Sequence, residues 1–119
     1  MSHDITLIAK FKIHEGKLEQ MRALYDEAME MVKTQEPDTR SFTLYVNEQE
    51  AVCVSYEIYK TSEAILENFR LSQDRIQRVL ETSDVISCDI YGDVSQDVIE
   101  LLTPYGANFY GYDRGYRRS

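Results

Sequence analysis

The sequence predicts one α+β domain built from two successive units, each of which combines strands with a helix. Three observations carry this prediction. A strand pattern places apolar residues at every second position, a helical pattern follows each strand region, and short polar segments separate the elements. The length of 119 residues suits one domain with a modest core. The order of the elements therefore decides the fold class.

The first unit begins with a strand and continues into a helix. Residues 5–13 carry apolar side chains at the odd positions and lysines at the later even ones, which is typical of a strand with one buried face. Pro37 marks the end of the helix. The apolar stripe of this helix repeats at spacings of three and four and consists of Leu18, Met21, Leu24, Tyr25, Ala28, Met31 and Val32.

The second unit opens with two strands, residues 41–46 and 51–59, and the polar turn 47–50 between them predicts a β-hairpin. We expect Ser62 to be the N-cap of the next helix, with Glu63 near the positive end of its dipole. A fourth strand follows at residues 85–91. The buried stripe of the second helix consists of Ala64, Ile65, Phe69, Ser72, Ile76, Val79 and Leu80.

The resulting order, β-α-β-β-α-β, predicts a ferredoxin-like antiparallel sheet with both helices on one face. The other face is not simply polar, because the third strand carries apolar residues on both of its sides. A second copy of the same chain is the simplest partner for such a face. We therefore expect a homodimer whose sheets face one another.

Residues 94–119 are expected to extend the domain formed by residues 1–93. Residues 95–102 predict a short helix that Pro104 and Gly106 end, and residues 107–112 are expected to be extended. Two roles are open for the aromatic residues of this tail: a strap packed over the domain or its dimer mate, or the lining of a pocket for a flat ligand. These residues are Tyr105, Phe109, Tyr110, Tyr112 and Tyr116.

Composition argues against several classes of protein. A formal net charge of −8 disfavours partners with anionic surfaces, namely nucleic acids and anionic membranes. We expect a cytoplasmic location, since no apolar run approaches the roughly 20 residues of a membrane span and no signal-peptide pattern precedes the first strand. Cys53 and Cys88 lie within strands without a CxxC motif, so we expect reduced thiols and not a disulfide or metal pair.

Strong catalytic motifs are absent from the sequence, which has no GxGxxG, P-loop, HExxH or Cys/His cluster. His3 lies near the N-terminus, and His14 lies at a strand-to-helix turn where a solvated or capping role is expected. We therefore expect no metal or haem cofactor. Any chemistry must come from tyrosines, carboxylates, amides or the ligand itself.

Residues 56–64, Tyr-Glu-Ile-Tyr-Lys-Thr-Ser-Glu-Ala, and residues 36–42, Glu-Pro-Asp-Thr-Arg-Ser-Phe, resemble the antibiotic biosynthesis monooxygenase (quinol monooxygenase-like) family of dimeric α/β-barrel proteins. In that family, Glu-x-Tyr or Glu-x-Trp ends the third strand. The resemblance covers residues 4–93, and the tail resembles longer members. Asp38 departs from the glycine that is usual there.

The resemblance implies a homodimer with a ligand cleft between the second helix and the sheet, and cofactor-independent oxygenation of a quinol or polycyclic phenol. Many members carry histidines in this helix. Asn68 and Gln73 stand here instead, which removes an axial haem ligand. The oxygenation needs no such ligand, because a quinol anion can itself donate an electron to oxygen.

The resemblance also supplies the candidate site residues. Asn68, Glu57 and Tyr56 are the catalytic candidates: Glu57 as a proton acceptor, Asn68 and Tyr56 as hydrogen-bonding partners of substrate oxygens. The alternative function is a non-catalytic dimeric ligand-binding or stress-associated barrel, which the missing histidines keep open. The expected partner besides the chain itself is a small aromatic ligand, bound by Phe42, Tyr59, Phe69 and Gln73.

Overall fold

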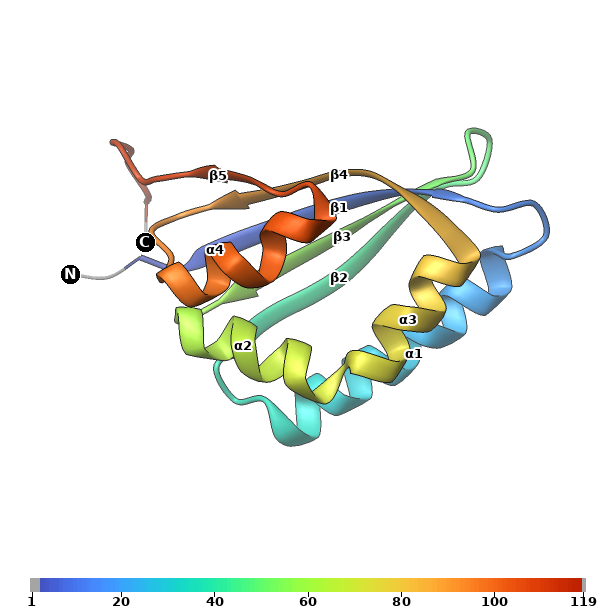
Figure 1. The fold of residues 1–119 in the computed structure, drawn as a ribbon, viewed down its shortest axis with the longest axis horizontal. Helices are drawn as coiled ribbons and strands as arrows, with labels where there is room; N and C mark the ends of the chain where they lie inside the picture. The colour runs from blue at the N-terminus through green and yellow to red at the C-terminus, as the bar shows by residue number, and fades with distance from the viewer. Residues whose placement is uncertain (1–2, 119) are drawn as a thin grey trace.

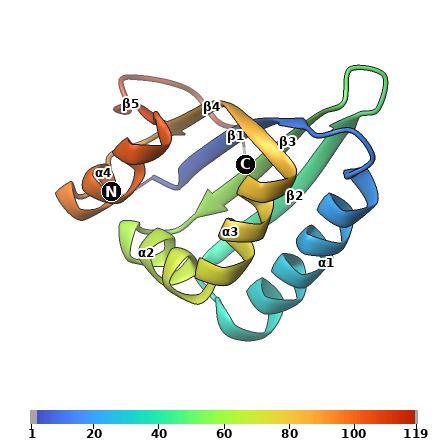
Figure 2. The same cartoon turned by 45° about the vertical axis from the view of Figure 1, so that its right-hand side comes forward.

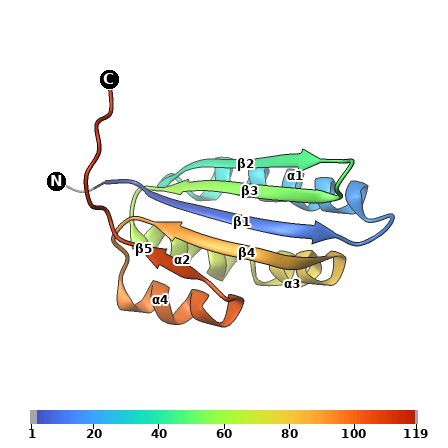
Figure 3. The ribbon, with the colours of Figure 1, turned by 90° about the horizontal axis from the view of Figure 1, so that it is seen from above.

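The computed structural model describes residues 3–118 and consists of one sheet with helices on a single face (Figures 1 and 3). Its strands are β1 (Ile5–Ile13), β2 (Thr39–Asn47), β3 (Val52–Tyr59), β4 (Ser83–Tyr91) and β5 (Asn108–Tyr110). Its helices are α1 (Leu18–Gln35), α2 (Ser62–Leu71), α3 (Gln73–Thr82) and α4 (Gln96–Leu102). The strand order across the sheet is β2-β3-β1-β4-β5. Neighbouring strands are antiparallel except β4 and β5, which are parallel.

Strand β1 lies between β3 and β4 and supplies the middle of the core. Its odd-numbered residues, from Ile5 to Ile13, are all buried, because alternation along the strand points them toward the helices. Helix α1 lies over the β2 side of the sheet beside α3, and Met21, Leu24 and Tyr25 of its predicted stripe are buried in the same core. The predicted ferredoxin-like α+β fold, with both crossovers on one face of the sheet, is confirmed.

The second helical region differs from the prediction of one continuous stripe. It divides at Ser72 into α2 and α3, which Figure 2 shows as two separate segments. The Ser72 N–H donates to the Phe69 carbonyl, three residues back, which closes a tighter turn than the four-residue spacing of an α-helix. The Ser72 hydroxyl accepts a hydrogen bond from Arg75 at 2.6 Å. A serine can satisfy these groups outside regular helix, which explains why neither proline nor glycine is needed for the break.

The predicted N-cap of this region is wrong by one residue. Thr61 caps α2, since its hydroxyl accepts from the Ala64 N–H at 3.2 Å. The Ser62 hydroxyl instead accepts from the Ser95 N–H at 2.9 Å. Ser62 therefore fixes the start of α4 against α2, a tertiary contact that local sequence does not reveal.

The C-terminal segment adds a strand to the sheet, which the sequence analysis did not foresee. After α4, a 3₁₀ turn (Thr103–Tyr105) leads into β5, where Phe109 packs against the core. The Tyr110 ring stacks on Tyr91 of β4, with ring centroids 5.2 Å apart. Further along, Tyr112 stacks on His3 at 4.1 Å. Strand β5 thus lies along the β4 edge of the sheet, and the chain after it runs past the strand ends near the start of β1, as Figure 3 shows.

The face of the sheet away from the helices is open and partly apolar. Val54 and Tyr56 of β3 are only half-buried there, and Tyr45 of β2, 59% exposed, meets Tyr56 edge to face. Tyr91 and Tyr110 continue this surface toward β5. None of the helices within residues 3–118 has the length and hydrophobicity needed to cross a membrane.

Gly92, directly after β4, gives a test of the close approach between this turn and β1. Its φ is +126°, and an added Cβ would lie 3.3 Å from the Asp4 carbonyl oxygen and 3.4 Å from the Ile5 Cα. Gly92→Ala should lower the free energy of unfolding by about 1–3 kcal/mol, measured by urea denaturation. Gly16→Ala, with φ +77° and no atom within 4 Å of its Cβ, is the control and should cost about 1 kcal/mol. Equal losses would contradict the role of the close approach.

Candidate active site

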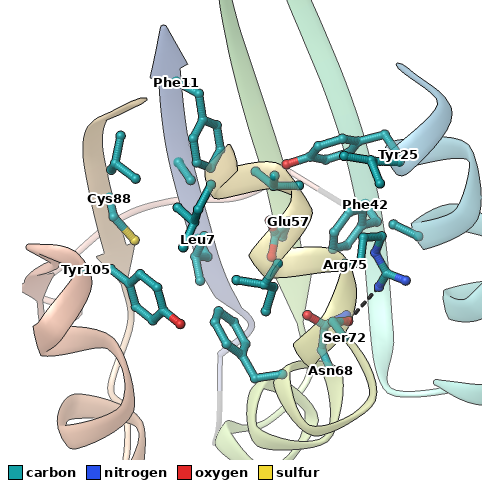
Figure 4. A pocket seen from close by; sticks show the side chains of 18 of the residues that line it. Leu7, Phe11, Tyr25, Phe42, Glu57, Asn68, Ser72, Arg75, Cys88 and Tyr105 are labelled. Carbon is teal, nitrogen blue, oxygen red and sulfur yellow. Dashed lines mark hydrogen bonds between the residues drawn. The ribbon is translucent and has the colours of Figure 1, made fainter. Parts of the chain in front are cut away.

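A cavity lies between the sheet and helices α1, α2 and α3, and it is partly open to solvent (Figure 4). Its volume is about 90 Å³. The walls are mainly apolar, and five aromatic rings contribute to them: Phe11, Tyr25, Phe42, Phe69 and Tyr105. Four polar residues interrupt this surface: Glu57, Asn68, Ser72 and Arg75. Such a combination of apolar walls and a few convergent polar groups is typical of a small-molecule site.

Glu57 is the buried carboxyl group of the cavity, with 6% of its surface exposed. Alternation along β3 places Ser55, Glu57 and Tyr59 on the face beneath the helices. The hydroxyls of Ser55, at 2.6 Å, and of Tyr59 both donate to the Glu57 carboxylate. Burial raises the pKa of Glu57 despite these two donors. The group therefore binds a proton more strongly than an ordinary glutamate, as a general base for a phenol requires.

Asn68 of α2 is held in one orientation by a second buried carboxylate. Its amide nitrogen donates to both oxygens of Glu36, at 3.0 and 3.3 Å, and the Thr39 hydroxyl donates to Glu36 at 3.0 Å. Because a carboxylate only accepts, the nitrogen of the amide must face Glu36. The Asn68 carbonyl oxygen has no hydrogen-bond partner within residues 3–118. It can therefore accept a hydrogen bond from a ligand hydroxyl.

Arg75 of α3 is the cation of the cavity. The guanidinium donates to the Ser72 hydroxyl at 2.6 Å and touches the Met31 sulfur at 3.9 Å. Burial lowers the pKa of Arg75, an effect opposed by the nearby carboxylates of Glu27 and Glu36. The side chain is half-buried and remains charged, since an arginine loses its proton only at strongly alkaline pH.

Burial also shifts a tyrosine and a cysteine of the cavity wall toward their neutral forms. Burial raises the pKa of the Tyr25 phenol and raises that of the Cys88 thiol to about 12. Cys53 is also buried, and burial raises its pKa to about 11. Both cysteines are free thiols, as predicted. Within the described part of the chain, histidine, cysteine and carboxylate side chains form no cluster of three or more that could hold a metal ion.

The structure brings four of the seven candidate residues to the cavity wall. Glu57, Asn68, Phe42 and Phe69 line it. Tyr59 does not line the cavity: it lies two residues after Glu57 on the same face of β3, is fully buried, and donates a hydrogen bond to the Glu57 carboxylate.

The remaining two candidates lie away from the cavity. Tyr56 lies on the opposite face of β3, so it does not reach the cavity of its own chain. Gln73 is exposed on α3, where its amide donates to the Phe69 carbonyl at 2.9 Å. His14 lies at the surface, where its Nε2 is 3.1 Å from Oδ1 of Asp84, in agreement with the predicted solvated role.

Sequence reasoning overlooked three polar or aromatic residues of the site, namely Tyr25, Ser72 and Arg75. Ser72 and Arg75 follow Asn68 at spacings of four and seven, which is the signal that places side chains on one helical face. Of the two roles left open for the tail aromatics, Tyr105 has that of pocket lining: it lies in the cavity wall, and its ring centroid is 6.2 Å from that of Phe69. Glu36 belongs to the segment 36–42 that carries the family resemblance, but no local pattern indicates its contact with Asn68, because only the fold brings the two together.

Comparison with known proteins defines the family. The antibiotic biosynthesis monooxygenase model matches residues 4–76. The chain belongs to this family. The resemblance noted in the sequence is thereby confirmed, and a search of curated proteins gives no match.

Solved structures of the family share this fold at low sequence identity. MupZ from Pseudomonas fluorescens is 14% identical, with a TM-score of 0.82 over 98% of this chain and 95% of its own. Rv0793 from Mycobacterium tuberculosis is 20% identical, with a TM-score of 0.66 over 79% and 98%. SnoaB from Streptomyces nogalater, a cofactor-independent oxygenase solved as a point mutant, is 9% identical, with a TM-score of 0.65 over 78% and 95%.

The buried Glu57 predicts a pH dependence of stability. Its pKa in the folded chain is raised above the ordinary value of 4.5, so the folded state retains a proton that the unfolded state releases. The stability linked to this proton is fully present below pH 4.5 and is lost as the pH rises through the folded-state pKa. Glu57→Gln should remove this part of the decline, measured by urea denaturation in buffers from the acid side of that range to neutrality. Parallel curves for both proteins would contradict the prediction.

Proposed function

We propose that the chain binds a quinol or phenol in the cavity and catalyses its oxygenation by molecular oxygen without a cofactor. The observation that carries the proposal is the meeting of a buried carboxyl group, Glu57, and an unpaired amide carbonyl, Asn68, inside an aromatic cavity. Membership of a monooxygenase family and the fold shared with a cofactor-independent oxygenase support it.

The cavity volume limits what the enclosed part can hold. The value of about 90 Å³ is smaller than the roughly 150 Å³ of an engineered apolar cavity that binds benzene. A single ring therefore fills the enclosed space with small side-chain movements. A polycyclic substrate places its reacting ring inside and extends the others through the open side.

The reaction begins with proton transfer from a ring hydroxyl to the Glu57 carboxylate, which leaves a phenolate. A second hydroxyl donates to the Asn68 carbonyl oxygen and fixes the ring. The phenolate gives one electron to oxygen, and the two radicals combine to form a C–O bond at a ring carbon that carries hydrogen. The hydroperoxide then loses water. One oxygen atom stays on the ring and the other leaves as water, so a phenol and O₂ give a quinone and H₂O.

This mechanism assigns the protein two tasks that the geometry suits. Glu57 must accept and return a proton, which typically contributes a rate factor of about 10²–10⁴. The apolar walls exclude water from the intermediates. Tyr25 and Phe42, whose ring centroids are 5.7 Å apart, form an aromatic wall beside Glu57.

Oxygen uptake with toluhydroquinone and naphthohydroquinone as substrates tests the function. Glu57→Gln should lower kcat by about 10²-fold or more, because the amide cannot accept the proton. Glu81→Gln, an isosteric change on the exposed side of α3, is the matched control and should keep the wild-type rate. Asn68→Ala should lower the rate as well, with circular dichroism to verify the fold, since Glu36 loses a donor.

The same assay separates the proposal from its alternative. Saturable binding of a quinol with oxygen uptake no faster than its autoxidation would reject catalysis and leave a ligand-binding protein. A wild-type rate in Glu57→Gln would reject the assigned base.

We also propose that two copies pair through the open sheet face, as is typical of the family. The half-buried Val54 and Ile58 and the exposed Tyr45 lie on this face. Val54→Lys should dissociate the dimer, because pairing would bury an unpaired charge. Gln77→Lys, exposed on α3, is the control. Sedimentation velocity measures the mass, and a folded wild-type monomer of 13.9 kDa would contradict the proposal.

A further inference from the structure

The cavity contains a cation for which the proposed reaction has no use. Among the described residues that line it, Glu57 and Arg75 carry the ionisable charges of opposite sign. On the sheet side, Glu57 accepts hydrogen bonds from the hydroxyls of Ser55 and Tyr59. Arg75 enters from α3 on the helix side, as Figure 4 shows.

Glu27 and Glu36, whose charges act on Arg75, already have other partners. Glu27 pairs with Arg78, at 3.1 and 3.4 Å. Glu36 accepts from Thr39 and from Asn68, each at 3.0 Å. Within residues 3–118, Arg75 forms no ion pair, although the other arginines of the helices, Arg22, Arg70 and Arg78, each do.

The contacts that Arg75 does make leave much of its hydrogen-bonding capacity unused. A guanidinium has five N–H donors, and the neutral acceptors in reach are the Ser72 hydroxyl and the weakly accepting sulfur of Met31. A half-buried cation without an anion costs free energy, which an anionic ligand would recover through a bidentate ion pair.

We infer that the ligand of this site carries a carboxylate on its aromatic ring and that Arg75 binds this carboxylate at the helix side of the cavity. The inference rests on the proposed function for the ring and the hydroxyl, and it adds the acid group. Arg75 is thus a specificity-determining residue that selects aromatic acids over neutral phenols of the same size. The hydroxyl end of such a ligand faces Glu57 and Asn68, while the acid end faces α3.

Calorimetric titration with a matched pair of ligands tests the inference. The probes are para-hydroxybenzoate and its neutral counterpart para-hydroxybenzamide, which have nearly the same shape. Wild-type protein should bind the acid about tenfold or more tightly than the amide, since a hydrogen-bonded pair of charges outweighs a neutral contact. Arg75→Gln should remove this preference, and Arg75→Lys should keep part of it.

Arg70→Gln is the control variant. Arg70 lies on the preceding helix, pairs with Glu67 at the surface and does not line the cavity, so its loss should leave both affinities unchanged. If Arg75→Gln does not fold, Arg75→Lys takes its place: it should retain only part of the preference for the acid, and a full wild-type preference in this variant would reject the bidentate role of Arg75.

The outcomes separate this inference from the proposed function. Equal affinities of the wild-type protein for acid and amide would overturn the role of Arg75 and leave the phenol site intact. Absence of binding for both ligands would overturn the phenol site and the inference together. An acid preference that survives in Arg75→Gln would reject Arg75 as its source.

Discussion

The alternation of side chains along β3 is the constraint on which the site depends. It places a serine, a glutamate and a tyrosine in succession beneath the helices, where most strands carry apolar residues. A carboxyl group at this depth is costly unless it is hydrogen-bonded. Ser55 and Tyr59 supply the donors from the same strand. Because the donors and the acceptor belong to one regular strand, the position of the carboxyl group is fixed by backbone geometry.

The break at Ser72 is the counterpart on the helix side. The two segments α2 and α3 meet here (Figure 2), and Asn68 of α2 and Arg75 of α3 both line the cavity beside Ser72 (Figure 4). The Ser72 hydroxyl takes a hydrogen bond from Arg75 at this point. Ser72 therefore lies at the end of α2 and also accepts a hydrogen bond from Arg75 of α3.

The site contains two buried carboxyl groups, Glu57 and Glu36, which have different hydrogen-bond partners and different roles. Within residues 3–118, the hydrogen-bond donors to Glu57 are the neutral hydroxyls of Ser55 and Tyr59, and burial outweighs them, so the pKa of Glu57 is raised. Glu36 is buried to a similar degree and fixes the amide of Asn68. The solved family members are only 9–20% identical to this chain. Since one fold can serve many functions, the polar residues of each site, and not the shared fold, indicate what each protein binds.

Strands β1 to β4, the first helix and the family could be predicted from the amino-acid sequence, because alternation and helical spacing act within a few residues of chain. The sequence also placed Glu57 and Asn68 among the candidates. The side of β3 that faces the cavity could not be predicted, since both sides of the strand carry bulky residues. The packing of the helices buries the Glu57 side and leaves Tyr56 on the other. The packing likewise lets Glu36 orient Asn68 across 32 positions and leaves Arg75 without an ion-pair partner among residues 3–118. Such pairings depend on how distant segments pack, so the local periodicity of the sequence does not predict them.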